Sequence, residues 1–102
     1  DALHAVAYNR LGQPLATGRL LQQATGIAQI GRMAVHRALR GSRLGQRVLQ
    51  ALTDSARERG DREVMLHAQS SAAGFYTRAG YAVRGNPFDE VGIAHVEMFK
   101  PL

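Results

Sequence analysis

The 102-residue sequence contains no cysteine and no tryptophan, and none of its apolar runs is long. Without cysteine there is no disulfide, no thiolate nucleophile and no cysteine-ligated zinc site. No run approaches the roughly 18 apolar residues that a membrane-spanning helix requires, and the polar start at residues 1–4 is unlike a secretion signal. We therefore expect a single domain, 1–102, that is soluble and cytoplasmic and does not associate with membranes.

Acidic residues are also missing, between Asp1 and Asp54. The same stretch contains seven arginines, which are Arg10, Arg19, Arg32, Arg37, Arg40, Arg43 and Arg47. Such an unopposed positive field attracts anionic ligands, either a polyphosphate cofactor or a nucleic acid. It is also compatible with a merely arginine-rich composition, since twelve of the thirteen basic residues are arginine. Charge alone leaves the class of partner open.

The first third of the chain has the pattern of an antiparallel meander. Strands are predicted at residues 3–8, 15–21 and 27–35. The Asn, Gly and Pro residues of segment 9–14 favour a hairpin turn, and segment 22–26 is predicted to be a connecting loop.

A β-α-β unit is predicted next. Apolar positions at helical spacing indicate a helix from Leu44 to Arg59, and Gly60 is a natural stop after it. Segment 63–68 is short and apolar and follows a helix, so we expect a buried strand parallel to strand 27–35. Together with the meander this gives a mixed central sheet in an α/β (α+β) fold.

The last third is predicted to add a second short helix and two further strands. The expected elements are a helix at 72–79, a strand at 81–84, a turn at 85–87 and a final strand at 93–99. Ser70 or Ser71 would cap this helix, and Gly80 would end it.

The loop before the first helix has the composition of an anion site. The first turn of a helix has unpaired N–H groups, and glycine lets an anion approach them. Neither G-x-x-x-x-G-K-[ST] nor G-x-G-x-x-G is present. Segment 40–45, RGSRLG, instead resembles the acyl-CoA pyrophosphate loop [QR]-x-x-G-x-[GA] of the GCN5-related N-acetyltransferases (GNAT). Arg43 stands where that family usually has glycine.

A second stretch resembles the same family, in the expected order. Segment 72–81, AAGFYTRAGY, is similar to the family pattern A-x-x-[FL]-Y-x-[KR]-x-G-[FY]. Segments 66–69, LHAQ, and 92–98, GIAHVEM, look most like the ElaA/YjcF branch. The resemblance implies a GNAT-like fold that begins at the hairpin, without the strand and two helices that usually precede it.

The resemblance also implies a binding site for acetyl-CoA, where strands 30–35 and 63–68 splay apart. The pantetheine amides would bond the strand edge formed by Met33, Ala34 and Val35. The pyrophosphate would contact Arg40, Gly41, Ser42, Arg43, Leu44, Gly45 and Gln46. Further cofactor contacts are implied for Gln69, Ala73, Phe75, Tyr76 and Arg78.

In the implied reaction an amine of a small molecule or peptide attacks the thioester directly, and a backbone N–H near Val35 stabilises the oxyanion. Tyr76 would protonate the leaving thiolate, because a phenol with a pKa of about 10 is a donor at neutral pH. Spacing alone favours a simpler role for Phe75 and Tyr76, which is packing of the helix against the sheet.

Three histidines are candidates for the general base, because imidazole titrates near neutral pH. His67 and His95 rank above His36, since both lie on strands near the expected cleft. Glu97 could act through a water molecule. A lone histidine on a strand is nevertheless more often structural, and two histidines without a third ligand predict no metal site.

Two other functions remain open at this point. The chain could bind CoA without catalysis, or its basic half could bind nucleic acid. The second is less favoured, because the aromatic residues are not interleaved with the arginines as a base-stacking surface requires. An exposed strand edge would also favour a homodimer.

Overall fold

The computed structural model describes residues 3–8, 11, 14–35 and 43–102. The elements in these segments are β1 (Leu3–Tyr8), β2 (Pro14–Ala24), β3 (Ile27–Val35), α1 (Leu44–Glu58), β4 (Glu63–Gln69), the 3-10 turn η2 (Ser70–Ala72), α2 (Ala73–Thr77), β5 (Ala82–Glu90) and β6 (Ile93–Pro101). The strands form one sheet in the order β1-β2-β3-β4-β6-β5. The predicted α/β fold is therefore confirmed. Neither described helix is long and apolar enough to cross a membrane.

Strands β3 and β4 form the one parallel pair among the described strands, as the β-α-β pattern predicts. A parallel pair needs a crossover connection, and α1 lies in that connection. The helix ends as expected before Gly60, whose φ of +90° favours glycine over residues with a side chain.

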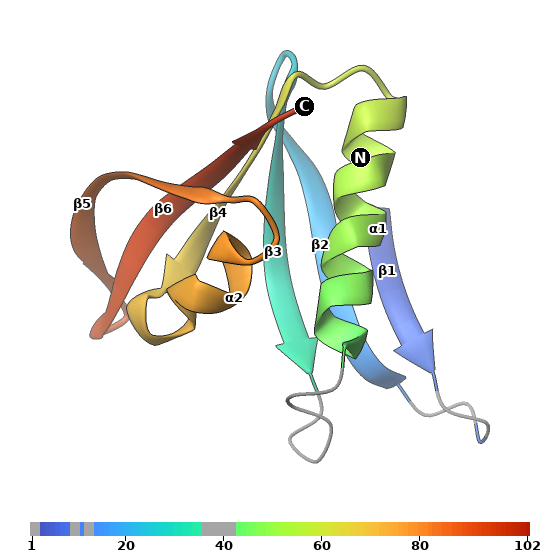
Figure 1. Cartoon of the computed structure of the whole chain (residues 1–102), viewed down its shortest axis with the longest axis horizontal. Coiled ribbons are helices and arrows are strands. Elements are labelled where there is room, and N and C mark those ends of the chain that lie inside the picture. Colours follow the sequence, from blue (N-terminus) through green and yellow to red (C-terminus); the bar gives the residue numbers. More distant parts are fainter. Residues whose placement is uncertain (1–2, 9–10, 12–13, 36–42) are drawn as a thin grey trace.

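Both helices lie on the same face of the sheet (Figure 1). Alternate residues of the central strands meet one stripe of α1 there and form a single core. Its fully buried large side chains include Leu20, Leu49, Leu52, Leu66 and Met98. The core thus lies between the sheet and α1, and α2 packs at its margin.

The last hairpin differs from the prediction. Strand β5 continues through segment 85–87, and the chain reverses instead at Val91 and Gly92, with φ values of +52° and +74°. The register of β5 against β6 shifts between Arg84 and Phe88. The glycine and proline of 85–87 therefore belong to a β-bulge in an edge strand, where a missing N–H is tolerated. The turn predicted at 85–87 was wrong.

The second helix is also shorter than predicted. Ser70 and Ser71 lie inside η2, α2 begins at Ala73, and no side chain caps either element. A capping serine needs an extended backbone just outside the helix, which a residue within a 3-10 turn does not have. The serine cap was therefore wrong, whereas Gly80, with a φ of +94°, follows α2 as a stop.

Strand β2 is longer than predicted. It continues to Ala24, so the loop expected at 22–26 is reduced to a turn at Thr25 and Gly26. The extra residues pair with β3, as in the Gln22–Ala28 pair.

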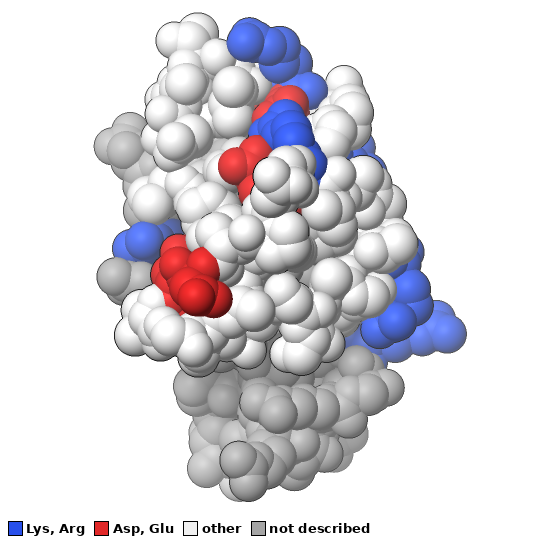
Figure 2. Space-filling model, turned by 90° about the vertical axis from the view of Figure 1, so that its left-hand side faces the viewer, with Lys and Arg blue, Asp and Glu red and all other residues white. Residues whose placement is uncertain are grey.

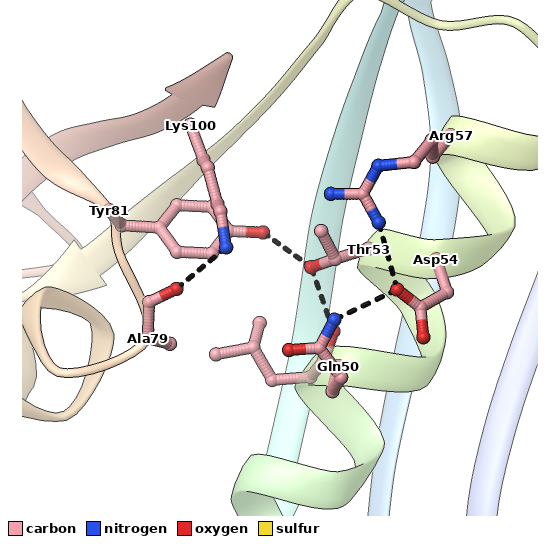
Figure 3. A network of polar contacts seen from close by, with 8 residues as sticks. Gln50, Thr53, Asp54, Arg57, Ala79, Tyr81 and Lys100 are labelled. Atoms are coloured by element: carbon pink, nitrogen blue, oxygen red, sulfur yellow. Dashed lines mark hydrogen bonds and ion pairs between the residues drawn. The ribbon is translucent and has the colours of Figure 1, made fainter. Parts of the chain in front are cut away.

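A buried hydrogen bond ties the segment after α2 to the middle of α1 (Figure 3). The Tyr81 hydroxyl lies 2.8 Å from Thr53 Oγ1, which itself donates to the Leu49 carbonyl at 2.9 Å. The Tyr81 hydroxyl is therefore the donor in the Tyr81–Thr53 bond. At the other side of Tyr81, Lys100 Nζ donates to the Ala79 carbonyl at 3.0 Å. These bonds hold the end of α2 at a fixed position relative to α1.

We expect Thr53→Val to lower the free energy of unfolding by about 1–3 kcal/mol, because it leaves the buried Tyr81 hydroxyl without its partner. Thr77→Val is the matched control, since exposed Thr77 makes the same bond to the carbonyl four residues earlier, at 3.0 Å, and its hydroxyl bonds no other described element. Its effect should stay within about 0.5 kcal/mol. Urea denaturation measures both, and equal losses would show that the Tyr81 bond contributes nothing.

Candidate functional site

The parallel strands β3 and β4 separate halfway along their length. Their pairs run from Ile27–Glu63 to Ile30–Leu66. Beyond these, β3 continues to Val35 paired with β2, and β4 continues to Gln69 paired with β6. Figure 1 shows the two strands diverging toward their carboxyl ends. Ligands in α/β sheets bind at such ends, so the predicted separation is present.

The edge of β3 at this opening contains Met33, Ala34 and Val35, the residues predicted to bond pantetheine. Here the β2–β3 register shifts, from the Arg19–Gly31 pair to the Thr17–Ala34 pair. A bulge bends its strand and interrupts pairing locally. It therefore helps to turn the end of β3 away from β4.

Helix α1 begins near the same end of β3. Its first turn contains no acidic residue, and its N-cap residue, Arg43, makes no side-chain capping bond. Arg43 has a φ of −86°, which suits any residue, so an arginine fits where the family usually has glycine. Gly45 is buried, Gln46 half-buried and Arg43 exposed. The electrostatics of this helix start favour an anion. Arg40, Gly41, Ser42 and His36 lie outside the described residues.

Tyr76 lies on α2, on the helix-bearing face of the sheet. Its ring makes edge contacts with Phe75 at 5.0 Å and Tyr81 at 6.2 Å between centroids. Burial raises the pKa of the Tyr76 phenol above its usual value near 10. Its hydroxyl forms no hydrogen bond with a described residue, unlike that of Tyr81. Tyr76 therefore packs in the margin of the core and also keeps an uncommitted phenolic proton at neutral pH.

The other predicted residues of α2 fall into two groups. Ala73 and Phe75 are half-buried against the core, whereas Arg78, at the C-terminal end of the helix, is exposed. Gln69, the last residue of β4, is exposed and pairs with His95 of β6. Gln69 and α2 thus follow one another at the open end of β4.

His67 and His95 come together on the opposite face of the sheet, around Glu90. His67 Nδ1 lies 3.5 Å from Glu90 Oε1, and His95 Nε2 lies 3.5 Å from Glu90 Oε2. The ring of Phe88 packs against both imidazoles, at 5.1 and 6.0 Å between centroids. His67 is exposed and His95 buried. We call these residues, His67, Glu90 and His95, the histidine–glutamate cluster.

The hydrogen bonds of His95 determine which of its nitrogens can take a proton. Nδ1 lies 2.8 Å from the Ile93 carbonyl oxygen, which can only accept, so Nδ1 carries hydrogen. Nε2 is therefore the ring nitrogen of His95 that faces Glu90. No three His, Asp or Glu side chains in the described segments are placed to hold a metal ion.

Glu97, considered as an indirect base, is engaged elsewhere. It accepts a hydrogen bond from Arg84 Nε at 2.6 Å, while the other end of the same guanidinium bonds Glu63 at 2.8 and 3.1 Å. The hydrogen bond from Arg84 holds the pKa of the Glu63 carboxyl below its usual range. This network joins strands β4, β5 and β6, and we assign it a structural role.

Known proteins identify the family to which this arrangement belongs. Residues 1–102 match the Acetyltransferase (GNAT) domain. The chain belongs to the GNAT acetyltransferase family. The resemblance to this family and to its ElaA/YjcF branch, predicted from the motifs, is confirmed.

Individual relatives agree with the GNAT assignment. The uncharacterized N-acetyltransferase YjcF of Bacillus subtilis is 31% identical over 98% of this chain and 71% of its own. Among solved structures, Escherichia coli ElaA has a TM-score of 0.86 at 26% identity and an acyl-CoA N-acyltransferase of Pseudomonas aeruginosa has 0.82 at 33%, each over 98% of this chain and 68% of theirs. The chain spans 66% of Bacillus subtilis YyaT, to which it is 33% identical over 97% of its own length. It thus spans about two-thirds of the length of these two Bacillus subtilis relatives.

Glu90 is the residue of this GNAT domain that sequence analysis missed. With a turn expected at 85–87, Glu90 belonged to no predicted strand. The observed turn at Val91 and Gly92 instead pairs Glu90 with Ile93, close to His95. The sequence signal for this register is weak, because valine is an unusual residue for positive φ.

The face of the GNAT domain seen in Figure 2 gives little support to nucleic-acid binding. Basic side chains form no continuous track across this face, and those near its centre lie beside acidic side chains. Several arginines of the described segments are paired with carboxylates, including Arg57 with Asp54 at 3.0 Å and Arg59 with Asp61 at 2.7 Å. A stacking and phosphate-binding surface needs unpaired cations in a continuous track.

Proposed function

We propose that this chain catalyses acetyl-CoA-dependent transfer of an acetyl group to an amine of a small molecule or peptide. One observation carries the proposal. At the opening between β3 and β4, Tyr76 lies on one face of the sheet and the histidine–glutamate cluster on the other. A proton donor and a proton acceptor on either side of one opening suit a reaction that needs both.

The acyl donor would bind on one side of this opening. Its pyrophosphate would bind at the start of α1, with Arg43, Leu44, Gly45 and Gln46, and with Arg40, Gly41 and Ser42 of the preceding segment. The pantetheine would follow the edge of β3 at Met33, Ala34 and Val35. The neighbouring elements would supply further contacts from Gln69, Ala73, Phe75, Tyr76 and Arg78.

The reaction requires one bond to form and one to break. The amine nitrogen attacks the thioester carbonyl carbon, and a backbone N–H near Val35 stabilises the oxyanion. The carbon–sulfur bond then breaks, and the thiolate takes the phenolic proton of Tyr76. The proton lost by the amine passes to the histidine–glutamate cluster. The reaction needs no covalent enzyme intermediate, so the absence of cysteine is no obstacle.

Within the cluster, His67 would accept this proton. The exposure of its side chain supports this role, whereas the side chain of His95 is buried. Glu90 lies between the two rings, 3.5 Å from each. Its carboxylate would hold the His67 ring in position, since one of its oxygens faces His67 Nδ1. His95 would then hold the second oxygen of Glu90 in place.

We expect acetyl-CoA to bind at one saturable site by isothermal titration, and Gly45→Asp to weaken this binding at least about tenfold. The added carboxylate would repel the pyrophosphate at the start of α1. Ala51→Asp is the control, because it adds the same charge to the exposed side of the same helix, farther from its start.

Thermal melts of both variants exclude unfolding as the cause of any loss. If the two substitutions weaken acetyl-CoA binding equally, the pyrophosphate does not bind at the start of α1. No binding by the folded wild-type chain would contradict the proposed function.

A further inference from the structure

A row of residues crosses the sheet at the level where β3 and β4 separate. Arg19 of β2 pairs with Gly31 of β3. Gly31 and His67 are the next positions on β3 and β4 after their last pair, Ile30–Leu66. Arg19, Gly31 and His67 therefore occupy three neighbouring strands at one height, with the opening between the second and the third.

These three residues face away from both described helices. Each follows or precedes a buried residue of the core beneath α1, respectively Leu20, Ile30 and Leu66. Because successive side chains of a strand point to opposite faces, Arg19 and His67 project from the other face of the sheet. This is the face that also bears Glu90.

Gly31 leaves an open space in this row. Apart from its two neighbours in the chain, no described residue has a heavy atom within 4 Å of a Cβ placed on Gly31. Paired strands are about 4.8 Å apart and β3 has begun to separate from β4 here, so the backbones of Arg19 and His67 lie at least roughly 10 Å from one another across Gly31. Arg19 lies on the strand to one side of Gly31, and His67 of the histidine–glutamate cluster lies on the strand to the other side.

Arg19 lacks a partner for part of its guanidinium. Its Nε is buried and has no hydrogen-bond partner, and Arg19 forms no ion pair with the acidic residues in the described segments. An arginine stays charged at all ordinary pH values, and an unsatisfied buried donor is costly. A guanidinium matches the geometry of a carboxylate, as it does that of a phosphate, with two parallel hydrogen bonds. Of these two groups, the carboxylate is the one that a small amino acid carries.

We infer that the amine substrate carries a carboxylate and that Arg19 binds this carboxylate. Arg19 lies on the opposite side of Gly31 from the histidine–glutamate cluster. The amino group of such a substrate would then lie at His67, where its proton is accepted. This inference rests on the proposed acetyltransfer and specifies its acceptor as an amino acid or a similarly charged small amine. Arg19 is a specificity-determining residue in this arrangement, because it contacts the substrate away from the reacting nitrogen.

Chain-matched acceptors test this assignment. Glycine, β-alanine, 4-aminobutyrate and 5-aminovalerate are compared with alkylamines of equal length that lack the carboxylate. We expect the best amino acid to be preferred over its alkylamine. Arg19→Gln should raise KM for that amino acid roughly 10- to 100-fold and leave kcat/KM for the alkylamine unchanged.

Two further variants sharpen the comparison. Gly31→Val fills the open space, so it should weaken the binding of every acceptor while the affinity for acetyl-CoA is retained. Arg62→Gln removes an exposed arginine at the opposite end of β4, and it should leave KM and kcat unchanged for both the amino acid and the alkylamine. Equal losses for amino acid and alkylamine in Arg19→Gln, or no preference in the wild type, would overturn the assignment.

A direct readout does not depend on turnover. The Nε–H signal of Arg19 in a 1H–15N NMR spectrum is identified by its loss in Arg19→Gln. It should shift saturably on addition of 4-aminobutyrate or a neighbouring member of the series, and not on addition of butylamine. If the signal shifts but no amine is acetylated, the carboxylate site is supported and the proposed reaction is overturned. No shift with any of the four amino acids would overturn the carboxylate site itself.

Discussion

Replacing Tyr76 with phenylalanine is expected to lower kcat by roughly 10²- to 10⁴-fold, the contribution typical of a positioned general acid. The hydroxyl makes no hydrogen bond with a described residue, so its loss should disturb packing little. Acetyl-CoA affinity should therefore remain within about twofold of the wild-type value. Single-turnover kinetics and isothermal titration measure the two quantities separately.

Tyr81→Phe is the control for this experiment, because it removes the same group from a neighbouring buried tyrosine. The Tyr81 hydroxyl is committed to Thr53 at 2.8 Å, so its loss should lower stability but leave kcat unchanged. If Tyr76→Phe keeps wild-type turnover, Tyr76 is a packing residue. The chain would then either use another donor or bind CoA without catalysis.

The raised pKa of Tyr76 gives the experiment a pH dependence. Burial disfavours the phenolate, so Tyr76 keeps its proton to a higher pH than the usual value near 10. If kcat falls with rising pH before pH 10 is reached, deprotonation of Tyr76 is not the cause, and the same fall should be seen in Tyr76→Phe. A fall that disappears in the variant would contradict the assigned direction of the shift.

The sequence predicted the parts of the fold that depend on local pattern. The parallel β-α-β unit follows from helical spacing between two apolar segments, and its end at Gly60 follows from the need for positive φ. The opening between β3 and β4 was predicted from the family resemblance. In the structure, this opening begins where the pairing of β3 with β4 stops, at Ile30 and Leu66.

The sequence did not predict the parts of the site that depend on strand register. Glycine and proline at 85–87 favour a turn when taken alone, but an edge strand can absorb them in a bulge. That choice moved the real turn to Val91 and brought Glu90 to His95. Arg19 and His67 are likewise far apart in the sequence, and only the pairing of three strands places them in one row.

The largest stability effect is expected at the contact between α1 and the strand that bears Arg19. Leu52 is fully buried, and its Cδ1 lies 2.7 Å from the position a Cβ would take on Gly18. Leu52→Ala should lower the free energy of unfolding by roughly 2–5 kcal/mol, through lost burial and the cavity left behind. That is a large share of the roughly 5–15 kcal/mol typical of a domain.

Gly18→Ala should be destabilising for the opposite reason, by roughly 1–3 kcal/mol. The added methyl would lie 2.6 Å from Met33 Sδ as well as 2.7 Å from Leu52 Cδ1, so both side chains would have to move. Met33 belongs to the strand edge proposed to bond pantetheine. This variant should therefore also weaken acetyl-CoA binding, whereas Leu52→Ala acts mainly on stability.

The two substitutions should be coupled when combined. In the double variant the methyl added by Gly18→Ala enters the space vacated by Leu52, so the total loss should fall short of the sum by about 1 kcal/mol or more. Leu49→Ala provides the matched cycle, because Leu49 is equally buried on α1 but supplies none of the three atoms nearest to the Gly18 position. Gly18→Ala should add to it without coupling. Urea denaturation of both double-mutant cycles measures the two coupling energies. Equal coupling in the two cycles would mean that Gly18 is not required specifically to make room for Leu52 and affects stability only through the backbone conformation of β2.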